Sequence, residues 1–238
     1  MSKIFIGAGH SNKVGSGRDC GAAANGYVEG ILTVELRDLI VKELNILGIT
    51  PVVDKNDSIF SETIATFRKL VSPNSITLDL HWNSGVSTAK GTETFIPKLA
   101  TKFEINLAEK LSKTVSEILE TPLRGKNGVK TELESHHKKL AWMGLTGENV
   151  LMEICFLSNA SEMQKYEKNK IILAKSIALV LKSFTEKNVV VVDTKVYVVV
   201  EGDTLSKVAK ENNTTIQKLI QINSLTTTSL KIGQKIKL

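Results

Sequence analysis

Residues 75–83 read SITLDLHWN, and residues 149–157 read NVLMEICFL. Each is a short, largely apolar run with few ionisable side chains, a pattern typical of a strand. Apolar residues at helical spacing separate these runs from each other and from a third run, KIFIGAG at 3–9. Strands that alternate with helices favour an α/β fold with a mixed, mostly parallel sheet flanked by helices.

The other elements follow from the same patterns on either side of residues 75–83. We expect further strands at 50–54, 91–97 and 128–133. We expect helices at 27–47, 61–72, 99–120, 136–144 and 169–187, and a long surface loop over 11–26. Ser61 is expected to open the second of these helices, with Glu62 in its first turn.

The sequence pattern changes after residue 187. Residues 188–196 are interpreted as a linker, although their valines would equally permit a β-strand. Residues 197–238 contain, in order, the strand pattern VYVVVEGD, the helix patterns TLSKVAKENN and TIQKLIQIN, and the strand pattern QKIKL. We therefore predict a large catalytic α/β domain at 1–187 and a small βααβ domain at 197–238.

Composition excludes several classes of protein. Of the 238 residues, 42% are hydrophobic and 24% are charged, which excludes an intrinsically disordered chain. The net charge of +6 is spread along the chain, so we expect no nucleic-acid partner. No run approaches the roughly 20 apolar residues of a membrane span, so we expect no membrane partner. Two cysteines make no disulfide framework, and the first residues lack a secretory signal, so we expect a cytoplasmic protein.

Three separate segments each place one metal-ligating side chain at the end of a predicted element. They are His10 after KIFIGAG, Glu29 in NGYVEGI and His81 in SITLDLHWN. Two imidazoles and one carboxylate can hold Zn²⁺ and leave a coordination position open for water. Glu153 adds a carboxylate that can accept a proton from that water. Because the carboxyl ends of parallel strands share one edge of a sheet, these residues predict a zinc hydrolase site there.

Each of these residues also has an ordinary structural explanation. His10 alone would be a loop residue, His81 a hydrogen-bonded core histidine, and Glu29 a solvated residue at a helix start. Each of these explanations is the better one for a residue taken singly, but the combination favours the metal site.

Four further residues have two open interpretations each. Asp79 and Asn83 share a strand face with His81 by alternation, so they either orient an imidazole or are simply polar residues of an exposed face. His136 and His137 lie among charged residues at the start of a predicted helix. A solvated helix face is the first interpretation for them, and a place in a substrate groove is the second.

Residues 1–187 resemble the zinc-dependent N-acetylmuramoyl-L-alanine amidases called amidase type 3. The matching motifs are GAGH, NGYVEG, LDLHWN, NGVK and MEICFLSN. The resemblance implies that His10, Glu29 and His81 bind Zn²⁺ and that Glu153 is catalytic.

The sequence departs from that family's pattern at three positions. Ser11 follows the first histidine where glycine is common, Trp82 follows the second where a small residue is common, and Cys155 replaces a glycine. These changes concern loop details and substrate preference more than the metal site.

Residues 197–238 resemble a LysM domain, with the hallmarks EGDTLSKVA, TTIQKLIQIN and LKIGQKIKL. LysM domains bind glycans that contain N-acetylglucosamine, such as peptidoglycan. The resemblance implies that two loops contact the glycan, through Gly202, Asp203, Thr204, Leu205, Ile222, Asn223 and Ser224.

The two resemblances together imply an enzyme that cleaves bacterial peptidoglycan between N-acetylmuramic acid and the L-alanine of the stem peptide. Wall cleavage by a protein without a signal peptide suggests a phage or prophage endolysin, which a holin would release from the cytoplasm. The alternatives are a bacterial autolysin or mother-cell lytic amidase, a zinc peptidase that cuts within the stem peptide, and an inactive wall-binding protein.

Overall fold

The structure, a computed structural model, describes residues 2–185, 196–212, 214, 216, 219, 220, 223, 225 and 227–237. Two compact units divide the chain, Met1–Lys187 and Asn188–Leu238, and each is described by itself. The predicted linker at 188–196 lies outside the described residues except for Val196, which begins a strand.

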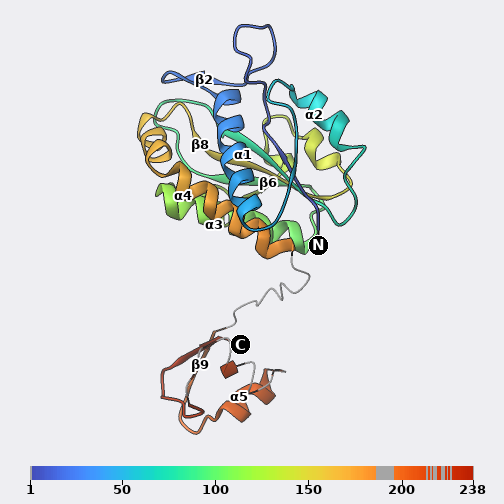
Figure 1. Cartoon of the computed structure of the whole chain (residues 1–238). Helices are drawn as coiled ribbons and strands as arrows, with labels where there is room; N and C mark the ends of the chain where they lie inside the picture. Colours follow the sequence, from blue (N-terminus) through green and yellow to red (C-terminus); the bar gives the residue numbers. More distant parts are fainter. Residues whose placement is uncertain are drawn as a thin grey trace. The chain divides into compact units, whose positions relative to one another are not determined.

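A six-stranded sheet forms the centre of the first unit (Figure 1). Its order is β4-β1-β5-β8-β6-β7. The strands are β1 (Ile4–Gly7), β4 (Val52–Val53), β5 (Ile76–Asn83), β6 (Glu93–Ile96), β7 (Val129–Thr131) and β8 (Glu148–Phe156). Neighbouring strands are parallel except β6 and β8, which pair antiparallel. The predicted mixed, mostly parallel sheet is therefore confirmed, with β5 and β8 at its centre.

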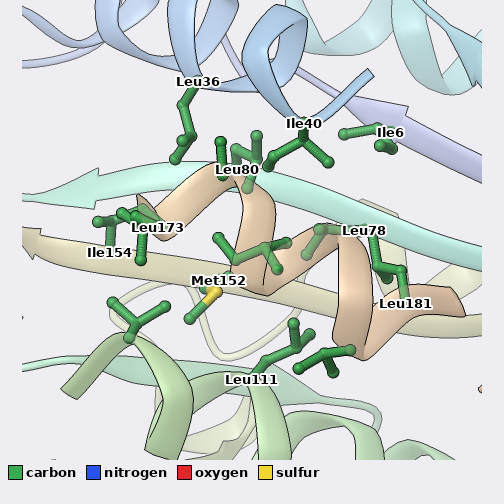
Figure 2. Packing of buried hydrophobic residues seen from close by; sticks show 14 of the residues in the cluster. Ile6, Leu36, Ile40, Leu78, Leu80, Leu111, Met152, Ile154, Leu173 and Leu181 are labelled. Carbon is green, nitrogen blue, oxygen red and sulfur yellow. The ribbon is translucent and has the colours of Figure 1, made fainter. Parts of the chain in front are cut away.

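Helices cover both faces of this sheet. The first face carries α1 (Glu29–Ile46), α3 (Lys102–Leu119) and α4 (Ala160–Thr185), whose apolar side chains share one buried cluster with those of β1, β5 and β8 (Figure 2). The second face carries α2 (Phe60–Phe67) and the 3₁₀ helix η2 (Ala141–Gly144), where Phe5, Phe67 and Trp142 form a smaller cluster. Both faces are therefore covered, as buried parallel strands require.

Alternation along β5 separates the core from the polar groups. Leu78 and Leu80 point into the large cluster and are fully buried. Asp79 and His81 consequently point to the other face, the one covered by α2 and η2. The polar side chains Asp79 and His81 therefore lie on the second face of the sheet, next to the small cluster and near the carboxyl end of β5.

The structure differs from the predicted helices in three places. The predicted helix at 136–144 is wrong, because only η2 is helical within it, and the preceding 3₁₀ helix η1 (Glu132–Glu134) ends before residue 136. The backbone between them turns, with Lys138 at a left-handed φ of 57°. Helix α2 begins at Phe60 after Ile59, so Ser61 does not open it, and Glu62 accepts a hydrogen bond from the Ile59 amide instead.

The third difference is the start of α4, which lies nine residues before the predicted residue 169, at Ala160. The Asn159 side chain accepts hydrogen bonds from the amides of Ser161 and Glu162, so it caps this helix. The cap explains why the helix starts well before the strongly apolar repeat.

The predicted loop over 11–26 contains a small hairpin, β2 (Ala23–Ala24) and β3 (Tyr27–Val28). Asn25 and Gly26 form its turn with positive φ angles of 52° and 80°, the conformation that an Asn-Gly pair favours in two-residue hairpins. The hairpin leads directly into α1 and so fixes the position of Glu29. Figure 1 shows the rest of this loop projecting from the unit.

An irregularity in β8 changes the direction of Cys155. The register between β5 and β8 shifts after His81 and Glu153, since Asn83 pairs with Phe156. Simple alternation predicts that Cys155 points the same way as Glu153, and this is wrong. The Cys155 thiol is buried in the large cluster, 4.0 Å from the sulfur of Met163.

The second unit has a β-α-β arrangement, with β9 (Val196–Val198), α5 (Leu205–Glu211) and β10 (Lys235–Lys237). β9 and β10 pair antiparallel. Its buried side chains form one cluster, Val199, Leu205, Val208, Ala209, Leu219 and Ile236. Of the predicted second helix, only parts are described, and among them Ile216, Leu219 and Ile220 are helical. No helix within the described ranges of either unit is long and apolar enough to cross a membrane.

Candidate metal centre and catalytic pocket

Three segments of the fold bring His10, Glu29 and His81 together. His10 follows β1, Glu29 is the first residue of α1, and His81 lies near the carboxyl end of β5. Glu29 Oε1 lies 3.5 Å from His10 Nε2 and 3.1 Å from His81 Nδ1. The potential ligand atoms of the three residues all lie within 4.8 Å of one another. Groups at such separations can bind a single ion.

The second nitrogen of each imidazole faces an aspartate. His81 Nε2 lies 2.9 Å from Asp79 Oδ2, and Asp79 is fully buried. His10 Nδ1 lies 3.4 Å from Asp19 Oδ1. A carboxylate on the outer nitrogen orients the ring and leaves the inner nitrogen for a metal. The structure thus places Asp79 where an orienting partner would lie, whereas Asp19, which sequence reasoning missed, lies near His10 Nδ1 without a hydrogen bond to it.

One interpretation of Asn83 is that it orients an imidazole, but its side chain binds Glu93 instead. Its side-chain amide donates to Glu93 Oε1 at 2.9 Å. Glu93 is itself buried and forms ion pairs with Arg124 and Lys130. Sequence reasoning missed this group, although Glu93 lies in the strand predicted at 91–97 and Lys130 belongs to the NGVK motif.

Glu29 is held in place by the backbone. Its Oε1 accepts a hydrogen bond from the Trp82 amide at 3.0 Å, and its Oε2 accepts one from the Ala22 amide at 2.9 Å. Burial by itself would raise the pKa of Glu29, but hydrogen bonds from His10 and His81 outweigh burial and lower that pKa. Glu29 is therefore an ionised carboxylate with a fixed orientation, as a metal ligand must be.

Gly21 has no space for a side chain beside this cluster. A Cβ atom at Gly21 would lie 2.5 Å from Glu29 Oε2 and 2.7 Å from His10 Cδ2, and its φ of 71° is in the left-handed region. The Gly-rich loop is therefore packed directly against two of the three candidate ligands.

The chemistry of this cluster fits Zn²⁺. Two imidazole nitrogens and one carboxylate form a common set of three protein ligands for catalytic zinc, in which the fourth position stays open. Each imidazole faces an aspartate, and the carboxylate is ionised, so the three side chains fit a divalent cation once His81 has lost its proton.

Glu153 lies beside the cluster on the neighbouring strand. It is the register partner of His81 on β5 and of Glu93 on β6. Its Oε2 is buried and has no hydrogen-bonding partner among the described residues. Burial, with the nearby carboxylates Glu29, Glu93 and Asp79, raises the pKa of Glu153 to about 8, although His81 opposes the shift. A bound cation at the cluster would favour the ionised form.

A buried ion pair supports the loop that carries His10. Asp54 accepts hydrogen bonds from the Arg37 guanidinium at 2.8 Å, from the Thr63 hydroxyl at 2.8 Å and from the Ala8 amide at 3.2 Å. Arg37 is 1% exposed, and it also donates to the backbone oxygen of Asp54 and to Asn56. This network fixes the backbone two residues before His10.

Replacing Asp54 with alanine is expected to lower the free energy of unfolding by about 3–5 kcal/mol, because the buried Arg37 charge would lose its buried partner and keep only the exposed carboxylate of Asp38. Urea denaturation of the metal-free protein measures this change. The matched control is Asp57→Ala, which removes an exposed carboxylate paired with Lys13 and should leave the midpoint unchanged. Equal effects of the two substitutions would contradict the structural role of Asp54.

A pocket of about 450 Å³ lies over the cluster. Its polar wall contains the three candidate ligands with Asp19 and Glu153. Its other lining residues are Ala22, Phe60, Trp82, Asn83, Ser84, Phe95, Ser135, His136, His137, Leu140 and Leu151. His136 and His137 are therefore not on a helix face, as first interpreted, but in a turn beside the pocket. Apolar members such as Phe60 carry no sequence signal that separates them from core residues.

The predicted glycan-binding residues of the second unit fall into two groups. The Asp203 side chain is buried, and it accepts hydrogen bonds from the Tyr197 hydroxyl, the Val200 amide and Lys207. Leu205 is also buried, in the cluster of the small unit. Gly202 and Thr204 are exposed, and Thr204 caps α5 by accepting from the Lys207 amide.

The outer side of this loop is thus formed by Gly202 and Thr204, while Asp203 and Leu205 hold its shape. On the predicted second loop, Asn223 donates to the backbone oxygen of Leu219. Ile222 and Ser224 lie outside the described residues.

Comparison with known proteins agrees with this geometry. The family model of N-acetylmuramoyl-L-alanine amidase matches residues 4–183, and the LysM domain model matches residues 197–238. One relative is YqiI, an uncharacterized protein of Bacillus subtilis strain 168. It is 27% identical over 166 residues, which cover 68% of this chain and 73% of YqiI.

Solved structures share the fold of the first unit. An N-acetylmuramoyl-L-alanine amidase from Clostridium difficile 630 has a TM-score of 0.61 at 23% identity, over 79% of this chain and 98% of that one. The catalytic domain of the amidase CwlV from Bacillus (Paenibacillus) polymyxa has a TM-score of 0.59 at 22% identity, over 77% and 98%. The catalytic domain of the CD27L endolysin, which targets Clostridium difficile, has a TM-score of 0.56 at 18% identity, over 78% and 97%.

The sheet, the His–Glu–His cluster and the adjacent buried carboxylate define this protein as a hydrolase with a cluster that fits zinc. The chain belongs to the N-acetylmuramoyl-L-alanine amidase family and carries a C-terminal LysM domain. Its domains imply peptidoglycan as the substrate and a wall glycan as the ligand of the LysM domain.

Proposed function

We propose that residues 1–187 hydrolyse the amide between the lactyl group of N-acetylmuramic acid and the L-alanine of the stem peptide, with Glu153 as the proton-transfer group. The observation that carries this proposal is Glu153 Oε2, which is buried beside the His10–Glu29–His81 cluster and has no hydrogen-bonding partner among the residues that the structure describes. The presence of all four side chains argues against an inactive wall-binding protein.

In this proposal His10, Glu29 and His81 hold Zn²⁺, and Asp79 and Asp19 keep the two imidazoles in orientation. Bound zinc would supply a Lewis acid for the scissile carbonyl and a more acidic water. Glu153 accepts the proton of the attacking water and later donates it to the leaving nitrogen of L-alanine, so one carboxyl acts first as base and then as acid. The apolar side chains of Phe60, Phe95 and Leu140 limit access of bulk water to these groups.

Mass spectrometry of digested peptidoglycan tests the bond that is cut. Free stem peptides that begin with L-alanine, together with intact glycan strands, are the expected products. Peptides that begin at a later residue would instead identify a zinc peptidase, which is the enzymatic alternative. Shortened glycan strands would exclude both.

The LysM domain is proposed to hold the enzyme on the wall, with contacts through Gly202 and Thr204 and through the loop at 222–224. Binding to the glycan raises the local concentration of the catalytic domain at its substrate. The domain boundaries in this proposal are 1–187, 188–196 and 197–238.

A fragment that ends at Lys187 is expected to cleave small soluble muropeptides at the rate of the full chain, because every proposed catalytic group lies before that residue. The same fragment should lyse intact walls more slowly, and residues 197–238 alone should sediment with peptidoglycan. Turbidity loss of wall suspensions and co-sedimentation measure the two effects. Full-rate lysis by the fragment, with no glycan binding by the isolated tail, would refute wall targeting by the LysM domain.

We further propose that the biological role is lysis of a host cell from within, as an endolysin. The pairing of a wall-cleaving domain with a wall-binding domain supports this role, and both cysteines are free, as in a protein that folds in a reducing compartment. A bacterial autolysin or mother-cell lytic amidase is the alternative.

Expression in a Gram-positive host separates these roles. An endolysin should lyse the culture abruptly when a holin is co-expressed and leave it intact without one. Lysis that does not depend on a holin, or a defect in cell separation or spore release when the gene is deleted, would support the alternative.

A further inference from the structure

The chain has four histidines, and all four line the pocket over the metal centre. His10 and His81 belong to the candidate ligand set, whereas His136 and His137 come from the turn between η1 and η2. These two side chains are exposed, and their rings meet edge to face, with centroids 5.3 Å apart. Within the part of the chain that the structure describes, neither ring has a hydrogen-bonding partner.

The charges of the pocket make these two residues distinctive. Its lining contains the carboxylates of Asp19, Glu29 and Glu153, and no lysine or arginine is among the lining residues that the structure describes. Among the described lining residues outside the metal cluster, His136 and His137 are therefore the only ones whose side chains can carry a positive charge. An anionic part of a substrate can find a charged partner there and at the metal, but not elsewhere in this pocket.

The turn that carries the two histidines is held in a defined shape. Glu132 accepts hydrogen bonds from the amides of Leu140 at 3.0 Å and Lys98 at 3.4 Å, so one carboxylate joins the turn to the segment after β6. Ser135 is buried and donates to the backbone oxygen of Glu132 at 2.6 Å. These bonds hold the turn without using either imidazole, which leaves both rings available to a ligand.

We propose that His136 and His137 form a subsite for the free carboxylate of the stem peptide, on the residue that follows L-alanine. The inference rests on the proposed amidase function. If the enzyme cuts the amide before L-alanine, the carboxylate on the next residue of the stem peptide lies close to the scissile bond. Imidazole N–H groups donate to a carboxylate in either charge state, and two adjacent rings can bind its two oxygens. The subsite therefore distinguishes a stem peptide with a free carboxylate from one in which that group is a carboxamide.

The test compares two small substrates, N-acetylmuramoyl-L-alanyl-D-glutamate and its D-isoglutamine analogue, which differ only in this group. With full-length, zinc-loaded enzyme we expect a preference for the carboxylate form. The double variant His136→Ala/His137→Ala should raise KM for that form about tenfold, with kcat little changed, and should largely remove the preference. The variant His136→Gln/His137→Gln, which restores neutral hydrogen-bond donors, should recover part of the preference for the carboxylate form.

The matched control is Lys138→Gln/Lys139→Gln, which removes two charges from the same exposed turn but from residues that do not line the pocket. It should leave the preference intact. Calorimetric titration of each substrate into the Glu153→Gln enzyme, with and without the histidine changes, measures binding apart from turnover. Thermal denaturation of every variant checks that the fold is retained.

The possible outcomes separate the two proposals. If the wild-type enzyme cleaves neither substrate, the amidase assignment fails, while the titration still decides whether the histidines bind the carboxylate. Suppose instead that both substrates are cleaved. If the double alanine variant raises KM equally for both, or if the lysine control also loses the preference, the carboxylate subsite is refuted and the amidase assignment stands.

Discussion

Replacing Glu153 with glutamine is expected to lower kcat by about 10²–10⁴-fold while the zinc content stays at the wild-type level. Glutamine has nearly the same shape as glutamate but cannot accept a proton from water. Glu153 is not one of the three candidate ligands, so the metal should stay bound. Steady-state kinetics on a soluble muropeptide and metal analysis of the same sample measure both quantities.

The control for this substitution is Glu148→Gln, at the other end of β8. Glu148 accepts a hydrogen bond from the Thr101 hydroxyl and lies away from the pocket lining, so its replacement should leave kcat unchanged. An activity of Glu153→Gln within a few-fold of wild type would show that another group is the base.

The same substitution should stabilise the metal-free fold. Burial raises the pKa of Glu153 from its ordinary value of 4.5 to about 8. The folded state therefore holds a proton that the unfolded state releases above pH 4.5, so the stabilisation is complete below that pH and is lost as pH rises to 8. Glutamine does not titrate, so the melting-temperature difference between Glu153→Gln and wild type should grow across this window. A constant difference would contradict the raised pKa.

Replacing His81 with alanine is expected to remove both zinc and activity. The remaining His10 and Glu29 are two ligands, fewer than the three protein ligands of catalytic zinc sites. The wild-type protein should contain one zinc per chain, and treatment with a chelator should abolish turnover and lower the melting temperature, because an ion that binds only the folded state stabilises it. His136→Ala is the control, and it should keep its zinc because His136 lies outside the cluster.

Zinc binding should also release protons. Burial lowers the pKa of His81, but Asp79 and Glu29 outweigh burial and raise that pKa well above its usual 6.5 in the metal-free protein. The imidazole is then protonated at neutral pH and must lose its proton to bind zinc, so the affinity for zinc should fall as the pH falls. Calorimetry in buffers of different ionisation enthalpy counts the released protons.

For the His81→Ala variant, a wild-type level of zinc would refute the assignment of His81 as a metal ligand.

Local sequence patterns were sufficient to predict the sheet and its covering helices. Runs such as SITLDLHWN alternate a core face with a polar face, and the alternation alone puts Leu80 inside and His81 toward the pocket. The predicted metal cluster depended on a general rule, that the ends of parallel strands meet at one edge. Motif resemblance then supplied the family.

The elements that were wrongly predicted depend on contacts between distant residues. The segment at 136–144 has an ordinary composition for a helix. The chain turns there instead, because the Glu132 side chain accepts a hydrogen bond from the Leu140 amide and Lys138 adopts a left-handed φ. A helix beginning at Ala160 depends on the Asn159 cap, and the inward direction of Cys155 depends on a register shift between two strands. None of these causes is a local periodicity.

The sequence by itself determined which side chains could do the chemistry, because residue type and strand alternation are local properties. Only the tertiary structure decided how they act together. It placed Asp79 within hydrogen-bond distance of His81 and brought His136 and His137 from a turn to the pocket. It also left Glu153 Oε2 buried near three other carboxylates, with no hydrogen-bonding partner in the described part of the chain. Charge, burial and hydrogen bonding at a site depend on which distant segments meet there, and one-dimensional spacing does not contain that information.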